Sequence, residues 1–110
     1  MAFIVIHTAQ HQLAFYAHNR LIRRYPIAIG KPETPTPHGH YTIAHKSLYP
    51  GGVFGSRWLG LSLPKYGIHG TNDPSSIGKS VSLGCIRMHN KDVEQLYTML
   101  PIGAPVVIRD

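Results

Sequence analysis

Sulfur and acidic side chains are scarce in this chain of 110 residues. Its single cysteine, Cys85, cannot close a disulfide within the chain, so covalent stapling of the fold is excluded. Five Asp and Glu residues stand against eleven Lys and Arg residues, which gives a net charge of +6, and no acid lies between Glu33 and Asp73. A basic surface favours anionic partners, although an excess of this size also serves solubility alone.

Long apolar runs are missing as well. No stretch is long enough to cross a membrane, and the N-terminal residues MAFIVIHTAQ lack the positively charged region of a secretory signal peptide. We therefore expect no transmembrane segment and no export signal, and we interpret residues 3–7 as a first strand. No repeat, low-complexity tract or linker interrupts the sequence, which predicts one domain over residues 1–110.

What the sequence does contain is a series of short β-rich runs. Strands are expected at 3–7, 12–17, 20–30, 40–46, 58–63, 66–70 and 104–109. His18 and Asn19 are expected to turn a hairpin, since both residue types tolerate left-handed backbone geometry. The proline-rich residues 31–39 and the glycine-rich residues 47–57 are predicted to be loops, the second long enough to form a lid or a rim.

One helix is expected at about 90–100. Asn90 can cap its start, with Asp92 and Glu94 in the first turn, and Pro101 and Gly103 end it. Its apolar residues recur at the spacing of one helical face: Val93, Leu96, Tyr97 and Leu100. Short strands with one amphipathic helix predict a mainly β fold, a β-sandwich or barrel-like sheet with the helix packed on it.

The lone thiol lies in SVSLGCIRMHN, residues 80–90, directly after Gly84. It is a small core residue, a lone metal ligand or a nucleophile. A nucleophilic thiol needs a base and oxyanion donors. Of eight histidines, His69 in YGIHG is the candidate base because it ends a predicted strand beside a glycine, and the amides of Gly84 and Cys85 are the candidate donors. Taken alone, these residues are a weak signal, because a lone cysteine in a domain is more often a buried packing residue.

A second group of histidines lies further upstream. His38 and His40 form an H-x-H pair on one predicted strand face, with His45 beyond them, and they are a candidate metal patch. No thiol or acid accompanies them at a ligand-like spacing, so a solvated strand face is the preferred interpretation. We expect no metal and no cofactor.

The segment IHGTNDPSSIGKSVSLGCIRMHNKDVEQLY, residues 68–97, resembles the catalytic segment of the YkuD-type L,D-transpeptidases. That family's pattern is His-Gly, a loop, and Ser/Thr-x-Gly-Cys-apolar-Arg, and it is matched at 69–70 and 82–87, with sixteen positions from His69 to Cys85. TPTPHGHYTI, residues 34–43, is similar to the family's proline-threonine stretch, so the resemblance covers essentially the whole chain. One departure is Leu83, where many members have histidine.

The resemblance implies a cysteine-dependent peptidoglycan L,D-transpeptidase, which is an acyltransferase. Cys85 would attack the L-centre carbonyl of a tetrapeptide stem, release the terminal D-amino acid, and transfer the acyl group to an amine of a second stem as a cross-link. Two alternatives remain. Water as acceptor would give an L,D-carboxypeptidase, and loss of chemistry would leave a non-catalytic cell-wall-binding module.

The resemblance also implies roles for individual residues. His69 would be the general base and acid, oriented by Gly70 and Ser82, while the amides of Gly84 and Cys85 hold the oxyanion. The expected substrate-binding residues are Arg87, Asn72, Tyr66 and Trp58. A structural hydrogen-bonding role for the arginine and core packing for the two aromatics are the competing interpretations.

The expected partners and location follow from the same resemblance. The partners are peptidoglycan stem peptides, with covalent inhibition by carbapenems, no nucleic acid, and a monomeric protein. The place of action expected from the family is the bacterial cell wall or spore envelope, by an export route that the sequence does not specify.

Overall fold

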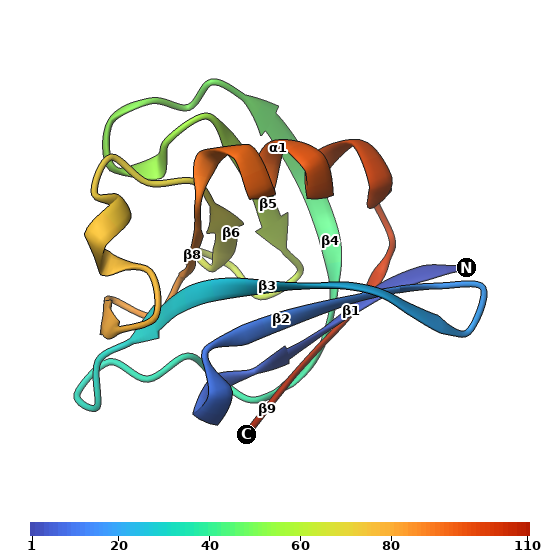
Figure 1. Ribbon diagram of the computed structural model, residues 1–110, viewed down its shortest axis with the longest axis horizontal. Coiled ribbons are helices and arrows are strands. Elements are labelled where there is room, and N and C mark those ends of the chain that lie inside the picture. The colour runs from blue at the N-terminus through green and yellow to red at the C-terminus, as the bar shows by residue number, and fades with distance from the viewer.

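Nine strands joined in one sheet dominate the structure, a computed structural model that describes residues 1–110 (Figure 1). The strands are β1 (Ala2–His7), β2 (Gln12–Ala17), β3 (Arg20–Gly30), β4 (Gly39–Leu48), β5 (Arg57–Leu61), β6 (Gly67–His69), β7 (Ser80–Ser82), β8 (Ile86–Met88) and β9 (Pro105–Arg109). The helical elements are α1 (Asn90–Met99) and three short 3-10 turns, η1 (Thr8–Gln10), η2 (Gly52–Phe54) and η3 (Pro74–Ser76).

The sheet closes on itself. Its strand order is β2-β1-β9-β4-β5-β6-β8-β3-β7, and β2 pairs with β3 in addition, so the first strand in this order meets the last but one. Strand β3 makes this closure possible because it spans 11 residues. Its first half pairs with β2, and its second half pairs with β8 and β7. Figure 1 shows β3 crossing the whole width of the molecule. The predicted mainly β, barrel-like fold is confirmed.

The core fills the inside of this curved sheet. Eighteen buried apolar residues form one cluster, and α1 contributes Val93 and Leu96 to it. The helix packs against β5 and β6, with Leu100 buried directly after its last turn. The helical face predicted from the sequence is therefore the one that faces the sheet, and Tyr97 at its margin is partly buried.

The hydrogen-bond partners at the two ends of α1 differ from those that the sequence predicts. The N-cap residue is His89, without a side-chain cap, and Asp92 is the only acid in the first turn, so Glu94 lies beyond it. Asn90 turns its amide toward the loops instead of capping the helix. At the other end, Lys46 Nζ donates to the carbonyl oxygens of Tyr97 and Leu100, at 2.6 and 3.1 Å. These contacts satisfy carbonyls that a helix leaves without an internal partner.

Most predicted strands are present, and two further strands were missed. Strands β7 and β8 have three residues each and flank the cysteine, and such short strands give no periodic signal. The predicted strand 58–63 ends earlier, at Leu61. Residues 31–38 and 49–56 form loops, apart from the single turn η2. The predicted loops 31–39 and 47–57 are therefore shorter than expected, because β4 takes Gly39, Ser47 and Leu48, and β5 takes Arg57.

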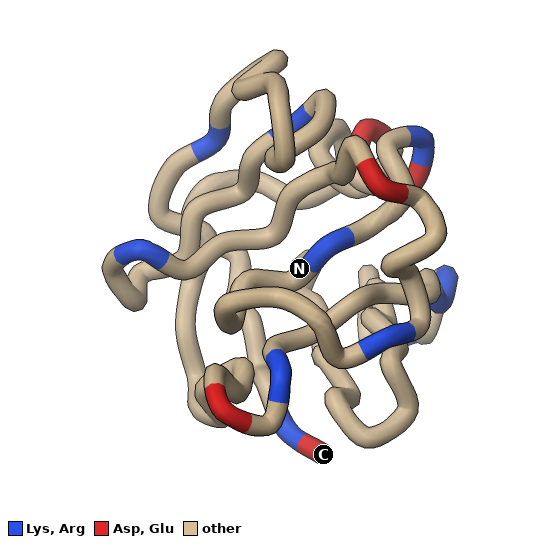
Figure 2. Tube along the Cα trace, turned by 90° about the vertical axis from the view of Figure 1, so that its left-hand side faces the viewer, with Lys and Arg blue, Asp and Glu red and all other residues tan.

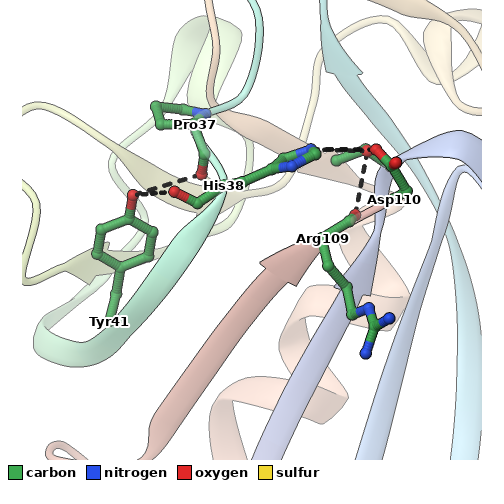
Figure 3. A network of polar contacts seen from close by, with 6 residues as sticks. Pro37, His38, Tyr41, Arg109 and Asp110 are labelled. Atoms are coloured by element: carbon green, nitrogen blue, oxygen red, sulfur yellow. Dashed lines mark hydrogen bonds and ion pairs between the residues drawn. The ribbon is translucent and has the colours of Figure 1, made fainter.

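The predicted histidine patch lies on the exterior. His38 Nε2 is 3.5 Å from Asp110 Oδ1, and the Tyr41 hydroxyl donates to the His38 carbonyl at 2.9 Å (Figure 3). No group of three or more His, Cys, Asp or Glu side chains gathers into a metal-binding arrangement.

Lys and Arg residues are spread over several loops and strands in Figure 2. None of the helices is long and apolar enough to span a membrane.

Candidate active site

Two neighbouring strands bring the candidate residues to one face of the sheet. Strands β6 and β8 run parallel, with Ile68 opposite Ile86 and His69 opposite Arg87. Both isoleucines are fully buried in the core, so the residues next to them point to the other side. Cys85 directly precedes Ile86 and by the same alternation shares the face of His69 and Arg87.

These side chains line a pocket of about 460 Å³. The lining residues are Val53, Phe54, Lys65, Tyr66, His69, Ser82, Leu83, Cys85 and Arg87. The rim is exposed, with 77% of Leu83 and 57% of Val53 accessible to solvent. The lining contains two cationic side chains and no carboxylate. The pocket is therefore open to a substrate chain and suits anionic groups.

The imidazole of His69 is fixed in one tautomer. Its Nδ1 lies 2.6 Å from the Gly70 carbonyl oxygen. A carbonyl only accepts, so Nδ1 carries the proton and the Nε2 lone pair is free. The ring is stacked on Trp58 at 5.7 Å and met edge-on by Phe54 at 5.1 Å. The side chain is held on three sides, which leaves one edge to act as a base.

The same surroundings keep His69 neutral. The pKa of His69 is lowered from 6.5 to about 4, chiefly because the ring is buried; the Gly70 hydrogen bond opposes this shift and the nearby charge of Arg87 adds to it. The imidazole is therefore an unprotonated base at neutral pH.

The thiol is also held in its neutral form. Burial raises the pKa of Cys85, opposed by a hydrogen bond from the Gly67 amide and by the charge of Arg87. Its Sγ donates to the Lys65 carbonyl oxygen at 3.6 Å. The resting pair is thus a thiol and a neutral imidazole, so proton transfer must accompany attack.

The turn that carries the thiol requires glycine at position 84. Gly84 has φ +122°, and a Cβ there would lie 2.6 Å from the Tyr66 ring. Within this turn, Ser82 Oγ donates to the Cys85 carbonyl oxygen at 2.6 Å and accepts from the Gly84 amide at 3.0 Å. Ser82 therefore shapes the turn that carries Cys85, and its hydroxyl makes no hydrogen bond to His69. The Gly84 amide is engaged as well, which leaves the Cys85 amide, without a hydrogen bond inside the protein, as the candidate oxyanion donor.

The proline-threonine stretch supports this turn from outside. The buried Thr36 donates to the Gly84 carbonyl oxygen at 2.9 Å and accepts from the Gly30 amide at 3.0 Å. Thr34 donates to the Ser82 carbonyl oxygen at 2.9 Å. The sequence pattern singled out this stretch but gave no role for its hydroxyl groups.

The other predicted site residues divide into two groups. Arg87 and Tyr66 line the pocket with the thiol and the imidazole. Asn72 is exposed in the loop after β6, and Trp58 stacks behind His69, so neither lines the pocket.

Further residues at the site were not predicted. They are Phe54, Lys65, Thr34, Thr36 and Asn90. A phenylalanine among the glycines of GGVFG was the one local signal, because a large apolar residue in a flexible loop favours a binding rim.

The sequence of this chain is similar to those of known proteins. Residues 1–108 match the family profile of the L,D-transpeptidase catalytic domain, YkuD. A Bacillus licheniformis protein named as an L,D-transpeptidase, YkuD, is 55% identical over 96 residues, which cover 87% of this chain and 58% of that protein. Its Bacillus subtilis namesake is 50% identical over 105 residues, covering 96% and 64% respectively. The chain therefore spans less than two thirds of these relatives.

Solved structures share the fold at lower identity. An L,D-transpeptidase from Mycobacterium smegmatis superposes with a TM-score of 0.88 at 20% identity, covering 99% of this chain and 58% of that one. The catalytic domain of the E. faecium L,D-transpeptidase gives a TM-score of 0.84 at 22% identity, covering 99% and 97%. An L,D-transpeptidase in complex with imipenem gives 0.85 at 18% identity, covering 98% and 58%.

Proposed function

The chain belongs to the L,D-transpeptidase catalytic-domain family, and we propose that it is a peptidoglycan L,D-transpeptidase with Cys85 as its nucleophile. One observation carries this proposal. Cys85 and His69 line the same open pocket, and the His69 Nδ1 proton is committed to the Gly70 carbonyl, which leaves Nε2 free to take the thiol proton.

In the first half-reaction the sulfur attacks the L-centre carbonyl carbon of a tetrapeptide stem. Nε2 of His69 accepts the thiol proton as the carbon–sulfur bond forms. The same proton is then given to the nitrogen of the terminal D-amino acid, which leaves as the peptide bond breaks. The product is a thioester between the stem and Cys85.

In the second half-reaction an amine of another stem attacks the thioester carbonyl. His69 accepts a proton from this amine and returns it to the sulfur as the thioester bond breaks. A new amide joins the two stems, and the thiol and neutral imidazole are restored. With water as the acceptor, the same steps would give carboxypeptidase activity.

Both half-reactions pass through an oxyanion. The Cys85 amide is available to hold it, a contribution worth about 3–4 kcal/mol per donor in comparable acyl transfers. Arg87 and Lys65 would attract the stem's carboxylates, and a guanidinium group can bind one in bidentate fashion. The exposed Leu83 would give the stem an apolar contact where many relatives have histidine. This substrate places the proposed activity at the bacterial cell wall.

Incubation with a purified tetrapeptide stem, followed by mass spectrometry, tests the proposal. We expect free D-amino acid and a cross-linked dimer, and a carbapenem should add to wild type but not to Cys85→Ala. Free D-amino acid without any dimer would assign the carboxypeptidase reaction. Absence of both a product and a thiol-dependent adduct would overturn the proposal.

A further inference from the structure

One peptide unit connects the imidazole to a side chain outside the pocket. The Gly70 carbonyl accepts from His69 Nδ1, and the amide of the same peptide unit, on Thr71, donates to Asn90 Oδ1 at 3.1 Å. The chain contains no cis peptide bond, so this carbonyl and amide point in opposite directions from one rigid plane. His69 and Asn90 therefore form hydrogen bonds to the two ends of one peptide group.

Asn90 makes this contact with every polar atom of its side chain engaged. Oδ1 also accepts from the Ser56 amide at 3.1 Å, and Nδ2 donates to the Thr71 carbonyl oxygen at 3.0 Å. Two donors at one end and an acceptor at the other allow only one orientation of the amide. The contact is close, because a Cβ at Gly55 or at Gly70 would collide with Asn90 Oδ1.

The Ser56 contact extends this control to the other side of the imidazole. Ser56 lies two residues after Phe54, whose ring meets His69 edge-on at 5.1 Å. Asn90 thus holds the hydrogen-bond partner of the ring and the base of the loop that covers it. The two segments are also joined directly, because the Gly70 amide donates to the Arg57 carbonyl oxygen at 3.2 Å. The asparagine at the start of α1 adds a side-chain connection between them.

We propose that Asn90 is a positioning residue for the reaction. It fixes the Gly70–Thr71 peptide so that the Gly70 carbonyl holds His69 as the Nδ1–H tautomer, with Nε2 directed into the pocket. Hydrogen bonding at the amide end also polarises the carbonyl end of a peptide unit, which strengthens its bond to the ring. The inference rests on the proposed function, in which His69 is the base. It assigns Asn90 a role at the site in place of the helix cap that the sequence predicts.

The first test compares three variants by imidazole ¹⁵N NMR, which reports the tautomer directly. Wild type should show the Nδ1–H form of His69, and Asn90→Ala should show a mixture with the Nε2–H form. Asn90→Asp loses the donor to the Thr71 carbonyl but keeps an oxygen acceptor for both amides, so it should retain the wild-type tautomer. Gln95→Ala is the matched control, since Gln95 lies on the same helix and its side chain bonds only Arg23 and Tyr25. It should lower the melting temperature without changing the tautomer.

The second test measures the rate of Cys85 acylation by a carbapenem at saturating concentration. Asn90→Ala should slow acylation about 10- to 100-fold because the base is misdirected, whereas Asn90→Asp should recover most of the rate and Gln95→Ala all of it. Should Asn90→Ala not fold, Asn90→Ser supplies the same comparison, because it removes the same amide group and keeps a small polar side chain.

The outcomes separate this inference from the proposed function. If Asn90→Ala keeps the wild-type tautomer and rate while melting lower, Asn90 is only structural and the inference is overturned. If wild type forms neither a product nor an adduct, the proposed function fails, and the tautomer comparison still decides the role of Asn90. A mixed tautomer in Gln95→Ala would also overturn the inference, because the effect would then follow from lost stability.

Discussion

The imidazole and the thiol face the same pocket but are held by different kinds of structure. His69 is the last residue of β6, a strand paired on both sides, and its ring is stacked on Trp58. Cys85 lies in a turn between two strands of three residues, and hydroxyl groups of Ser82 and Thr36 hold that turn. The proposed base is thus positioned by the sheet and its aromatic packing, and the proposed nucleophile by side-chain hydrogen bonds to a turn that contains glycine at a positive φ.

The turn should be the more fragile half, and Gly84→Ala should break it most severely. The Cβ of an alanine at this position would meet the Tyr66 ring. The alanine would also have to adopt φ +122°, a conformation that L side chains rarely adopt. We expect a loss of stability of about 1–3 kcal/mol and loss of acylation at Cys85. Gly78→Ala is the control, because Gly78 also has a positive φ, +92°, but open space around its Cβ position. Equal acylation by the two variants would show that the turn tolerates the added methyl group.

The lowered pKa of His69 should make the stability of the fold depend on pH in the acid range. Above pH 6.5 the ring is neutral in both folded and unfolded protein. As the pH falls, His69 of the unfolded chain takes up a proton near its ordinary pKa of 6.5. In the folded protein the ring stays neutral until the pH approaches its pKa of about 4. The depressed pKa should therefore cost about 3 kcal/mol of stability between pH 6.5 and 4. Chemical denaturation at several pH values should show this loss in wild type, and a much flatter profile in His69→Gln.

A milder change to the turn should separate its supports. Thr36→Val keeps the side-chain shape but leaves the Gly84 carbonyl and the Gly30 amide without their partner, at a cost of about 1–3 kcal/mol. The Gly84 carbonyl and the Cys85 amide share one peptide unit, so acylation should slow as well. Thr34→Val loses a single hydrogen bond at a less buried position and should have a smaller effect on both quantities. The opposite ranking would show that the buried threonine does not align the nucleophile.

These supports also mark the limit of sequence interpretation. Alternating runs in the long strands predicted the barrel-like sheet, and the resemblance to the YkuD-type family predicted that Cys85, His69 and Arg87 belong to one site. Thr36 contacts Gly84 across 48 positions, and Asn90 contacts Ser56 and Thr71 across 34 and 19. No local pattern encodes contacts of this kind. Thr36 stands between two prolines and Asn90 stands at the start of a helix, and both residue types are ordinary in such positions. The local sequence therefore did not indicate their roles at the site.

The smallest predicted effect lies outside both halves of the site. Lys46 joins β4 to the end of α1 through the carbonyls of Tyr97 and Leu100, with its Nζ 4.1 Å from the centre of the Tyr97 ring. Lys46→Met keeps the apolar stem and removes these contacts, so thermal or chemical unfolding should show a loss of about 1 kcal/mol. Acylation of Cys85 should be unchanged, because both halves of the site are supported by other elements. A slower acylation in this variant would mean that the position of α1 as a whole, and with it Asn90, controls the imidazole, and the two halves would then be less independent than their separate supports indicate.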